Sequence, residues 1–286
     1  MQRIGRPRIR RWATDRLIRL ALAHGGIGRG WNAVAVLHDR GSPALLARIQ
    51  ALVRSPNARR RALGLDIAAQ LRKPGSIHDY ERVPFALEAT GAMLVAALDD
   101  PHLAVRQSAI AGLGHRPVEA ALPALLAHAQ HPDARIRFAL AHALGSYADP
   151  QATAASMRLA SDSDDDVRDW ATFDIGTLRD ADDEAIRALL WKNAHDSNRD
   201  VRGEAVVGLA RRSDPRAIEL LKDRLLDDDC RVYELEAAEE MPRPELLEPL
   251  QRLRADAEKT RDLDPYWYRH LLEAIDACAL VADATP

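Results

Sequence analysis

One segment of the chain combines an aromatic pair with charged side chains at helical spacing. Residues 164–178 read D-D-D-V-R-D-W-A-T-F-D-I-G-T-L and bring Trp170, Phe173 and Asp174 together in one predicted helix. Aromatic side chains with charged neighbours are typical of binding hot spots. In a helix, the positions two, five to six and nine residues after the arginine of this segment, Arg168, share one face. We therefore predict a partner-binding stripe across this and the equivalent helices, made of His115, His142, Asp169, Trp170, Phe173, Asp174, Thr177, Glu204 and Arg211. In the alternative interpretation, Trp170 and Phe173 only fill space between neighbouring helices.

No pattern typical of catalysis or metal binding accompanies this stripe. Five histidines fall between residues 102 and 142, but none has the spacing of a zinc site. The acidic run Asp162–Asp166 lacks the glycine and the distal glutamate of a calcium loop, and helix capping explains it. A G-x-S-x-G nucleophile motif is also missing. We expect a protein that is not an enzyme and needs neither a metal nor a cofactor.

The frame around Arg168 recurs along the chain. The shared features are an apolar residue followed by arginine, an alanine three positions after that arginine, and an apolar residue and a glycine seven and eight positions after it. The arginine positions are Arg106, Arg137, Arg168 and Arg202, with Tyr233 in a fifth copy, so the steps are 31, 31, 34 and 31 residues. A fixed period in this range is the mark of stacked repeats. We predict an all-α fold, a right-handed α-α superhelix of about six to seven helical hairpins.

The residue types of the frame suggest what each position does. Asp and Pro at the breaks start helices, because Asp caps free amide groups and Pro suits the first turn. Gly114, Gly145 and Gly176 are expected where a helix ends and the chain turns. The repeated arginine is expected to lay its stem on the next unit and pair with a preceding Asp one repeat away, which would form a ladder.

The repeat pattern also divides the chain. Residues 1–30 are predicted to be a basic arm and a cap helix, residues 31–250 the repeat array, and residues 251–286 two capping helices. An insertion at about 72–84 lengthens one step to 45 residues, from Arg61 to Arg106. We expect a single elongated domain, because stacked repeats have no separate cores.

Charge is distributed unevenly. Residues 1–73 carry a balance of +13 and residues 145–286 one of −14, although the whole chain has a net charge of only −3. A basic end could bind nucleic acid through Arg8, Arg10, Arg11, Arg59, Arg60 and Arg61. Opposite ends could also attract each other, so we expect a monomer or a weak head-to-tail association. Two cysteines favour a reducing, cytoplasmic location, and no apolar run is long enough to span a membrane.

The repeated residues resemble those of HEAT-type repeats. The copies V-R-Q-S-A-I-A-G-L-G from Val105 and V-R-G-E-A-V-V-G-L-A from Val201 are similar to the short bacterial form named after phycobilisome-lyase subunits. This resemblance covers about residues 31–250. It implies a protein-protein interaction scaffold or adaptor that binds a macromolecular partner on its concave face. Bilin lyases and HEAT-like DNA glycosylases resemble the repeat too, but no tetrapyrrole site is marked here and the acidic middle and end of the chain disfavour a DNA groove.

Overall fold

The computed structural model describes residues 9–24, 28–75, 83–227, 230–259 and 264–284. These residues form sixteen α-helices and three short helical turns, and they contain no strand, only an isolated bridge between Arg72 and Pro84. They divide into two compact units, Met1–Ala152 and Thr153–Pro286. The single elongated domain expected from the sequence stays a prediction.

Unit 1 consists of successive helical hairpins. Its helices are α2 (Thr14–His24), α3 (Arg29–His38), α4 (Pro43–Val53), α5 (Ala58–Ala69), α6 (Leu87–Ala96), α7 (Leu103–His115), the turn η1 (Glu119–Ala121), α8 (Leu122–Leu126) and α9 (Ala134–Leu144). Helix α10 (Pro150–Leu159) spans the boundary. The predicted insertion is closed at its base, where the Lys73 amide donates to the Val83 carbonyl at 2.9 Å. Residues 76–82 of that insertion lie outside the described residues.

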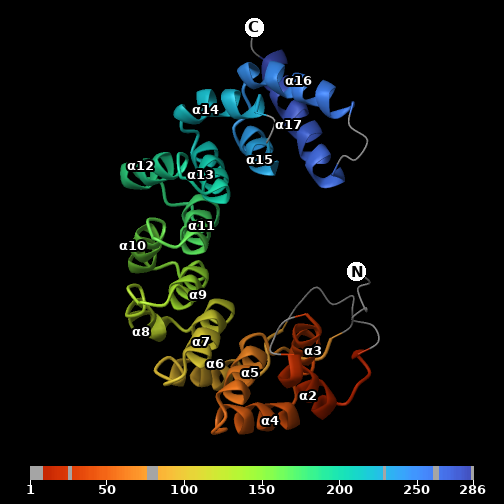
Figure 1. The fold of residues 1–286 in the computed structure, drawn as a ribbon, viewed down its shortest axis with the longest axis vertical. Coiled ribbons are helices and arrows are strands. Elements are labelled where there is room, and N and C mark those ends of the chain that lie inside the picture. The colour runs from red at the N-terminus through yellow and green to blue at the C-terminus, as the bar shows by residue number, and fades with distance from the viewer. Residues whose placement is uncertain (1–8, 25–27, 76–82, 228–229, 260–263, 285–286) are drawn as a thin grey trace. The chain divides into compact units, whose positions relative to one another are not determined.

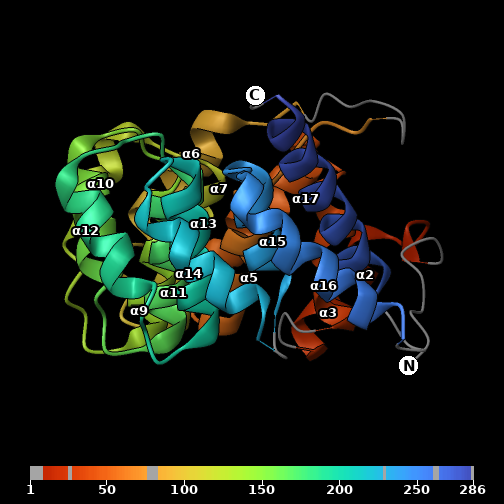
Figure 2. The ribbon, with the colours of Figure 1, turned by 90° about the horizontal axis from the view of Figure 1, so that it is seen from above.

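Unit 2 continues the same hairpins. Its elements are α11 (Asp165–Phe173), η2 (Asp174–Leu178), α12 (Glu184–Asn193), α13 (Arg199–Arg211), α14 (Arg216–Leu225), α15 (Val232–Glu240), η3 (Pro244–Leu246), α16 (Leu247–Ala257) and α17 (Pro265–Asp283). Helices α11, α13 and α15 follow one another in one row, and α12 and α14 lie behind it (Figure 1). Helix α17 packs beside α15 at the end of this row, as Figure 2 also shows. We call α11, η2, α13 and α15 the second-helix row.

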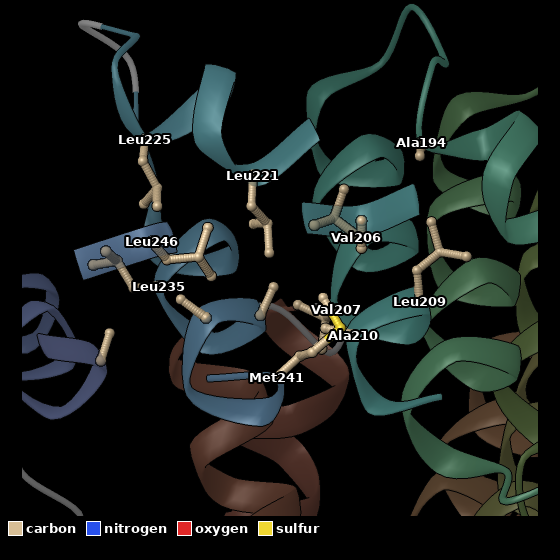
Figure 3. Close-up of a cluster of buried hydrophobic side chains, with 14 of the residues drawn as sticks. Ala194, Val206, Val207, Leu209, Ala210, Leu221, Leu225, Leu235, Met241 and Leu246 are labelled. Atoms are coloured by element: carbon tan, nitrogen blue, oxygen red, sulfur yellow. The ribbon is translucent and has the colours of Figure 1, made fainter. Parts of the chain in front are cut away.

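Small and branched apolar side chains hold the rows together. Ala205 and Leu209, three and seven residues after Arg202, are fully buried, as the frame predicts. Figure 3 shows side chains of α13, α14 and α15 pointing toward one another, among them Val206, Leu221 and Leu235. The apolar faces of α13, α14 and α15 therefore pack against one another, which is how neighbouring repeats share a core.

Polar residues start the helices where the sequence predicts them. The side chains of Asp133, Asp164 and Asp183 accept backbone N–H groups in the first turns of α9, α11 and α12. Asn198 does the same for α13. The acidic run before α11 is thus explained by capping, which satisfies amides that the helix itself leaves free.

The glycines of the frame do not share one role. Gly114 lies inside α7, Gly145 ends α9 in right-handed conformation, and Gly176 lies within η2. A β-carbon on Gly114 would lie 2.8 Å from the Ala143 Cα atom, and one on Gly176 would lie 3.0 Å from the Glu204 carbonyl oxygen. Gly114 and Gly176 therefore allow neighbouring helices to approach each other, whereas Gly145 lies where its helix ends, as predicted.

The arginine ladder exists, but it runs in the opposite direction. The Arg168 guanidinium bonds both carboxylate oxygens of Asp196 at 3.0 and 2.9 Å, and Arg61 bonds both of Asp100 at 2.8 Å. Each acid belongs to the following repeat, not to a preceding one. Each arginine also donates to the carbonyl six residues before it, a contact that recurs from Arg61 to Arg202 at 2.8–3.1 Å. The acid six residues before the next arginine thus links two repeats.

Within the described part of the chain, no helix combines the length and the apolar character that crossing a membrane requires.

Candidate functional site

The second-helix row of unit 2 contains an irregular element beside the aromatic pair. Helix α11 changes at Asp174 into the π-turn η2. A π-turn leaves backbone carbonyls without their usual partners, and such turns are frequent at functional sites. The buried Arg212 replaces those partners, because its guanidinium donates to the carbonyls of Ile175 and Gly176 at 2.7 and 2.9 Å. It also reaches the carbonyls of Arg179, Ala181 and Gly208.

Asp174 supports this turn from inside. Its side chain is fully buried, and its Oδ2 atom accepts the Arg179 Nε–H at 3.0 Å. Arg179 in turn donates to the Thr153 hydroxyl at 3.1 Å. Burial raises the pKa of Asp174, while Arg179 acts in the opposite direction. The sequence prediction placed Asp174 on the binding stripe, but a buried carboxylate paired within the chain cannot contact a partner.

Trp170 and Phe173 do lie together on α11. Their ring centroids are 5.6 Å apart with an interplanar angle of 63°, an edge-to-face arrangement that aromatic pairs prefer. Both side chains are partly buried. Asp169 is on the same helix, and burial together with the charges of Asp200 and Asp166 raises its pKa to about 6.

A hollow of about 400 Å³ opens next to Phe173 on the second-helix row. It is lined by Phe173, Thr177, Glu204, Val207, Arg211, Glu236, Glu239 and Glu240. Four residues of the predicted stripe, Phe173, Thr177, Glu204 and Arg211, therefore meet in one place. They come from two successive repeats, α11 with η2 and α13, and α15 of the next repeat adds the other three glutamates. We call this feature the acidic hollow.

Negative charge dominates the acidic hollow. Its one cation, Arg211, is paired with Glu240 at 2.8 Å. Burial raises the pKa of Glu204 to about 8, and Asp169, Glu236 and Asp200 contribute to the increase by repulsion. Burial and the charges of Glu204, Asp200 and Asp169 also raise the pKa of Tyr233. The carboxylates of this row are thus crowded and short of countercharge.

One cluster at the end of the row has the donor atoms of a metal site. The ligand atoms of Glu239, His270 and Glu273 lie within 4.8 Å of one another. His270 Nδ1 is 2.8 Å from Glu239 Oε1 and 3.6 Å from Glu273 Oε2. A hydrogen bond between the imidazole and Glu239 accounts for the closest of these approaches without an ion.

The histidines of the predicted stripe belong to unit 1. The rings of His115 on α7 and His142 on α9 have centroids 5.0 Å apart at 70°. Burial lowers the pKa of both, and for His142 the neighbouring His115 adds to the effect. The structure brings these two residues together, although His115 lies nine positions after its repeat arginine and His142 five positions after its own.

The predicted nucleic-acid residues are placed unequally. Arg10, Arg11, Arg59 and Arg60 are exposed, whereas Arg8 lies outside the described residues. Arg61 is held by Asp100 and by the carbonyls of Ser55 and Pro56, so its guanidinium is part of the ladder. Nucleic-acid binding by the exposed arginines stays a prediction.

Sequence reasoning missed several residues of the acidic hollow. Val207 lies five positions after Arg202, so the stripe rule itself could have identified it. Glu236, Glu239 and Glu240 occur in the worn repeat from Val232, where glutamates replace small residues. That replacement adds carboxylates to the surface beside α13.

Stacked helical hairpins with one ladder residue per repeat define an all-α repeat protein. The HEAT repeats family model matches residues 91–176 and 157–242, more than half of the chain, and the chain belongs to the HEAT-repeat family.

Among curated proteins the chain is related to Protein YibA of Escherichia coli, in strain K12 and in O157:H7. It is 27% identical to each over 235 residues, which cover 79% of this chain and 80% of the relative. The X-ray structure of the E. coli YibA protein is similar as well, with a TM-score of 0.68 at 25% identity over 96% of this chain and 95% of that one. The all-α HEAT-repeat fold predicted from the sequence is confirmed.

Proposed function

We propose that this protein is a non-enzymatic scaffold that binds another protein on the second-helix row of unit 2. The observation that carries the proposal is the convergence of Phe173, Thr177, Glu204 and Arg211 on one hollow. The repeat frame needs none of these four residues for capping, packing or the ladder. HEAT repeats are typically protein-binding scaffolds, and the family relationship supports the same role here.

The aromatic pair strengthens this assignment. Trp170 and Phe173 form a partly buried edge-to-face pair with charged neighbours on both sides. Large aromatic side chains supply most of the binding energy at many interfaces, because they bury a large apolar area in few rotamers. We expect the partner to cover Phe173 and the adjoining acidic hollow. Whether this row is the concave face of the array stays a prediction.

Affinity purification of the tagged full-length chain from its native host, followed by binding measurements with the purified partner, tests the proposal. Phe173→Ala and Trp170→Ala should each weaken binding at least about tenfold, since each removes one ring of the aromatic pair. Leu226→Ala is the matched control, because Leu226 is an exposed apolar residue at the end of α14, outside the row. Its binding should equal that of the unmodified chain.

Circular dichroism separates loss of binding from loss of fold. Trp170 and Phe173 are only partly buried, so replacing either ring should leave the helical signal intact. A partner that binds both variants with unchanged affinity would contradict the proposal. Substrate turnover by the purified chain would contradict its non-enzymatic part.

A further inference from the structure

The acidic hollow has the lining of a site for a long cationic side chain. Phe173 and Val207 are apolar, while Glu204, Glu236 and Glu239 supply carboxylates. Its volume of about 400 Å³ compares with roughly 30 Å³ for one water molecule, so there is room for an entire side chain. Lys and Arg combine an apolar stem with a charged head, and both stack favourably on aromatic rings.

Two of the four glutamates lack a cation. Glu240 is paired with Arg211 and Glu239 with His270. Glu204 has no hydrogen-bond or ion-pair partner among the described residues, and Glu236 has only a 3.5 Å contact with the Tyr266 hydroxyl. Carboxylates that lose water without gaining a partner are costly, so this arrangement favours an incoming cation.

A buried polar atom points to a ligand independently of the acids. Thr177 lines the hollow, and its Oγ1 atom is buried without a hydrogen-bond partner in the described part of the chain. Buried hydroxyls are normally hydrogen-bonded, and an exception calls for an explanation. An ammonium or guanidinium group donates several hydrogen bonds and could serve both this hydroxyl and the carboxylates.

We propose that the acidic hollow binds a Lys or Arg side chain from a basic segment of the partner protein. This assignment rests on the proposed function and names the chemistry of the partner. The stem lies against Phe173 and Val207, and the cationic head lies among Glu204, Glu236 and Thr177. A phosphate-bearing partner is disfavoured, because the same carboxylates would repel it.

Binding of a cation changes the protonation of Glu204. The groups that face Glu204 are Asp169 on α11, Asp200 on its own helix α13, and Glu236 and Tyr233 on α15. Arg211, which also lines the hollow, is neutralised by Glu240. A bound cation lowers the pKa of Glu204 from about 8, so binding releases a proton near neutral pH. Affinity should consequently rise as the pH increases toward 8 and level off above it.

A capped, fluorescent peptide of alternating Lys and Ala tests the proposal with the full-length chain. The same peptide with every Lys acetylated is the control, because it keeps the stems and loses the charge. We expect the charged peptide to bind at least about tenfold more tightly than the acetylated one. Glu236→Gln should weaken its binding about tenfold. Glu204→Gln should remove the increase of affinity with pH.

A matched double substitution controls for general charge attraction. Glu219→Gln with Asp223→Asn removes two acids from α14, outside the second-helix row, and should change the affinity less than twofold. Equal weakening by this control and by Glu236→Gln would overturn the proposal, as would equal binding of the acetylated peptide. Circular dichroism of each variant verifies the fold.

Two further measurements separate failure of the cation site from failure of the scaffold function. If the partner protein depends on Phe173 but is indifferent to Glu236→Gln, the scaffold function stands and the cation site is overturned. Sedimentation without peptide tests a second copy of this chain as the occupant, because residues 1–73 carry +13. Self-association that Glu236→Gln abolishes would overturn the assignment to a different protein.

Discussion

At the scale of single residues, the ladder arginine links one repeat to the next. Arg168 donates to the Asp162 carbonyl within its own repeat and to the Asp196 carboxylate in the following one. Asp196 also accepts the Asn198 amide at 2.8 Å, which shapes the loop before α13. One acid therefore satisfies a loop amide and an arginine from the neighbouring repeat, so its position is fixed from both sides.

Arg168→Lys should destabilise the protein. The planar guanidinium bonds both oxygens of Asp196, a geometry that an ammonium group cannot reproduce. The side chains of Arg168 and Asp196 are only 12% and 15% exposed, so water replaces the lost bonds poorly. We expect the free energy of unfolding to fall by about 2 kcal/mol. Urea denaturation followed by circular dichroism measures it.

The control for this prediction is Arg135→Lys. Arg135 also bonds a carboxylate, that of Asp133, but its side chain is 67% exposed. The change should cost less than about 0.5 kcal/mol. Equal losses for the two variants would mean that the ladder does not stabilise the repeat stack.

At the scale of elements, regular helices could be predicted and irregular ones could not. Gly and Pro breaks and apolar spacing mark the ends of α2 (Thr14–His24) and α4 (Pro43–Val53) in the sequence, so such helices can be predicted. The apolar segment 120–129 has similar spacing but divides into η1 and the short α8. The π-turn η2 has no sequence signal, because it depends on Arg212, which lies more than 30 residues away.

The same limit applies to the candidate site. The stripe rule found Phe173, Thr177, Glu204 and Arg211, since these positions follow helical spacing from the ladder arginines. It misassigned Asp174 because the rule assumes a regular α-helix, and the helix changes form at that residue. It could have found Glu239, which lies six positions after Tyr233, but Glu236 lies three positions after Tyr233 and is outside the spacing of the stripe.

Arg212→Lys should disrupt the element that carries part of the acidic hollow. A lysine has three donors, whereas Arg212 serves five carbonyls of η2, its flanking loop and α13. Buried carbonyls left without a donor cost roughly 1–3 kcal/mol each, so we expect a loss of about 3 kcal/mol. The wavelength of Trp170 fluorescence should shift as η2 loosens, provided that the other tryptophans are replaced by phenylalanine.

The neighbouring residue provides the control. Arg211→Lys keeps the same chemistry one position away, but Arg211 is 34% exposed and contacts a carboxylate rather than the turn. This change should cost less than about 0.5 kcal/mol. If both variants unfolded at the same urea concentration, Arg212 would have no special role in holding η2.

At the scale of the whole molecule, the net charge differs strongly between the two ends of the chain. Residues 145–286 carry −14, and part of that excess is concentrated where Asp169, Glu204 and Glu236 face one another. Like charges at short range destabilise the folded chain, because unfolding separates them. A surface on which carboxylates repel one another, although the repulsion destabilises the folded chain, is suited to binding a cationic partner.

The crowding predicts how stability depends on pH. The pKa of Glu204 is about 8 in the folded protein and 4.5 in its ordinary state. Below pH 4.5 the group is protonated in both states and contributes nothing. Between these values the folded chain retains a proton that the unfolded chain releases, so rising pH favours unfolding. The loss is complete above about pH 8.

Glu204→Gln should therefore stabilise the protein selectively at high pH. The gain over the unmodified chain should be near zero at pH 4 and reach roughly 2 kcal/mol at pH 9, after allowance for solvent screening. Urea denaturation at several pH values measures it, and the difference between the two proteins cancels the contributions of all other titrating groups. A gain for Glu204→Gln that is equal at pH 4 and pH 9 would mean that the repulsion within the acidic hollow is absent, and the site would then have no unmet charge to offer a basic partner.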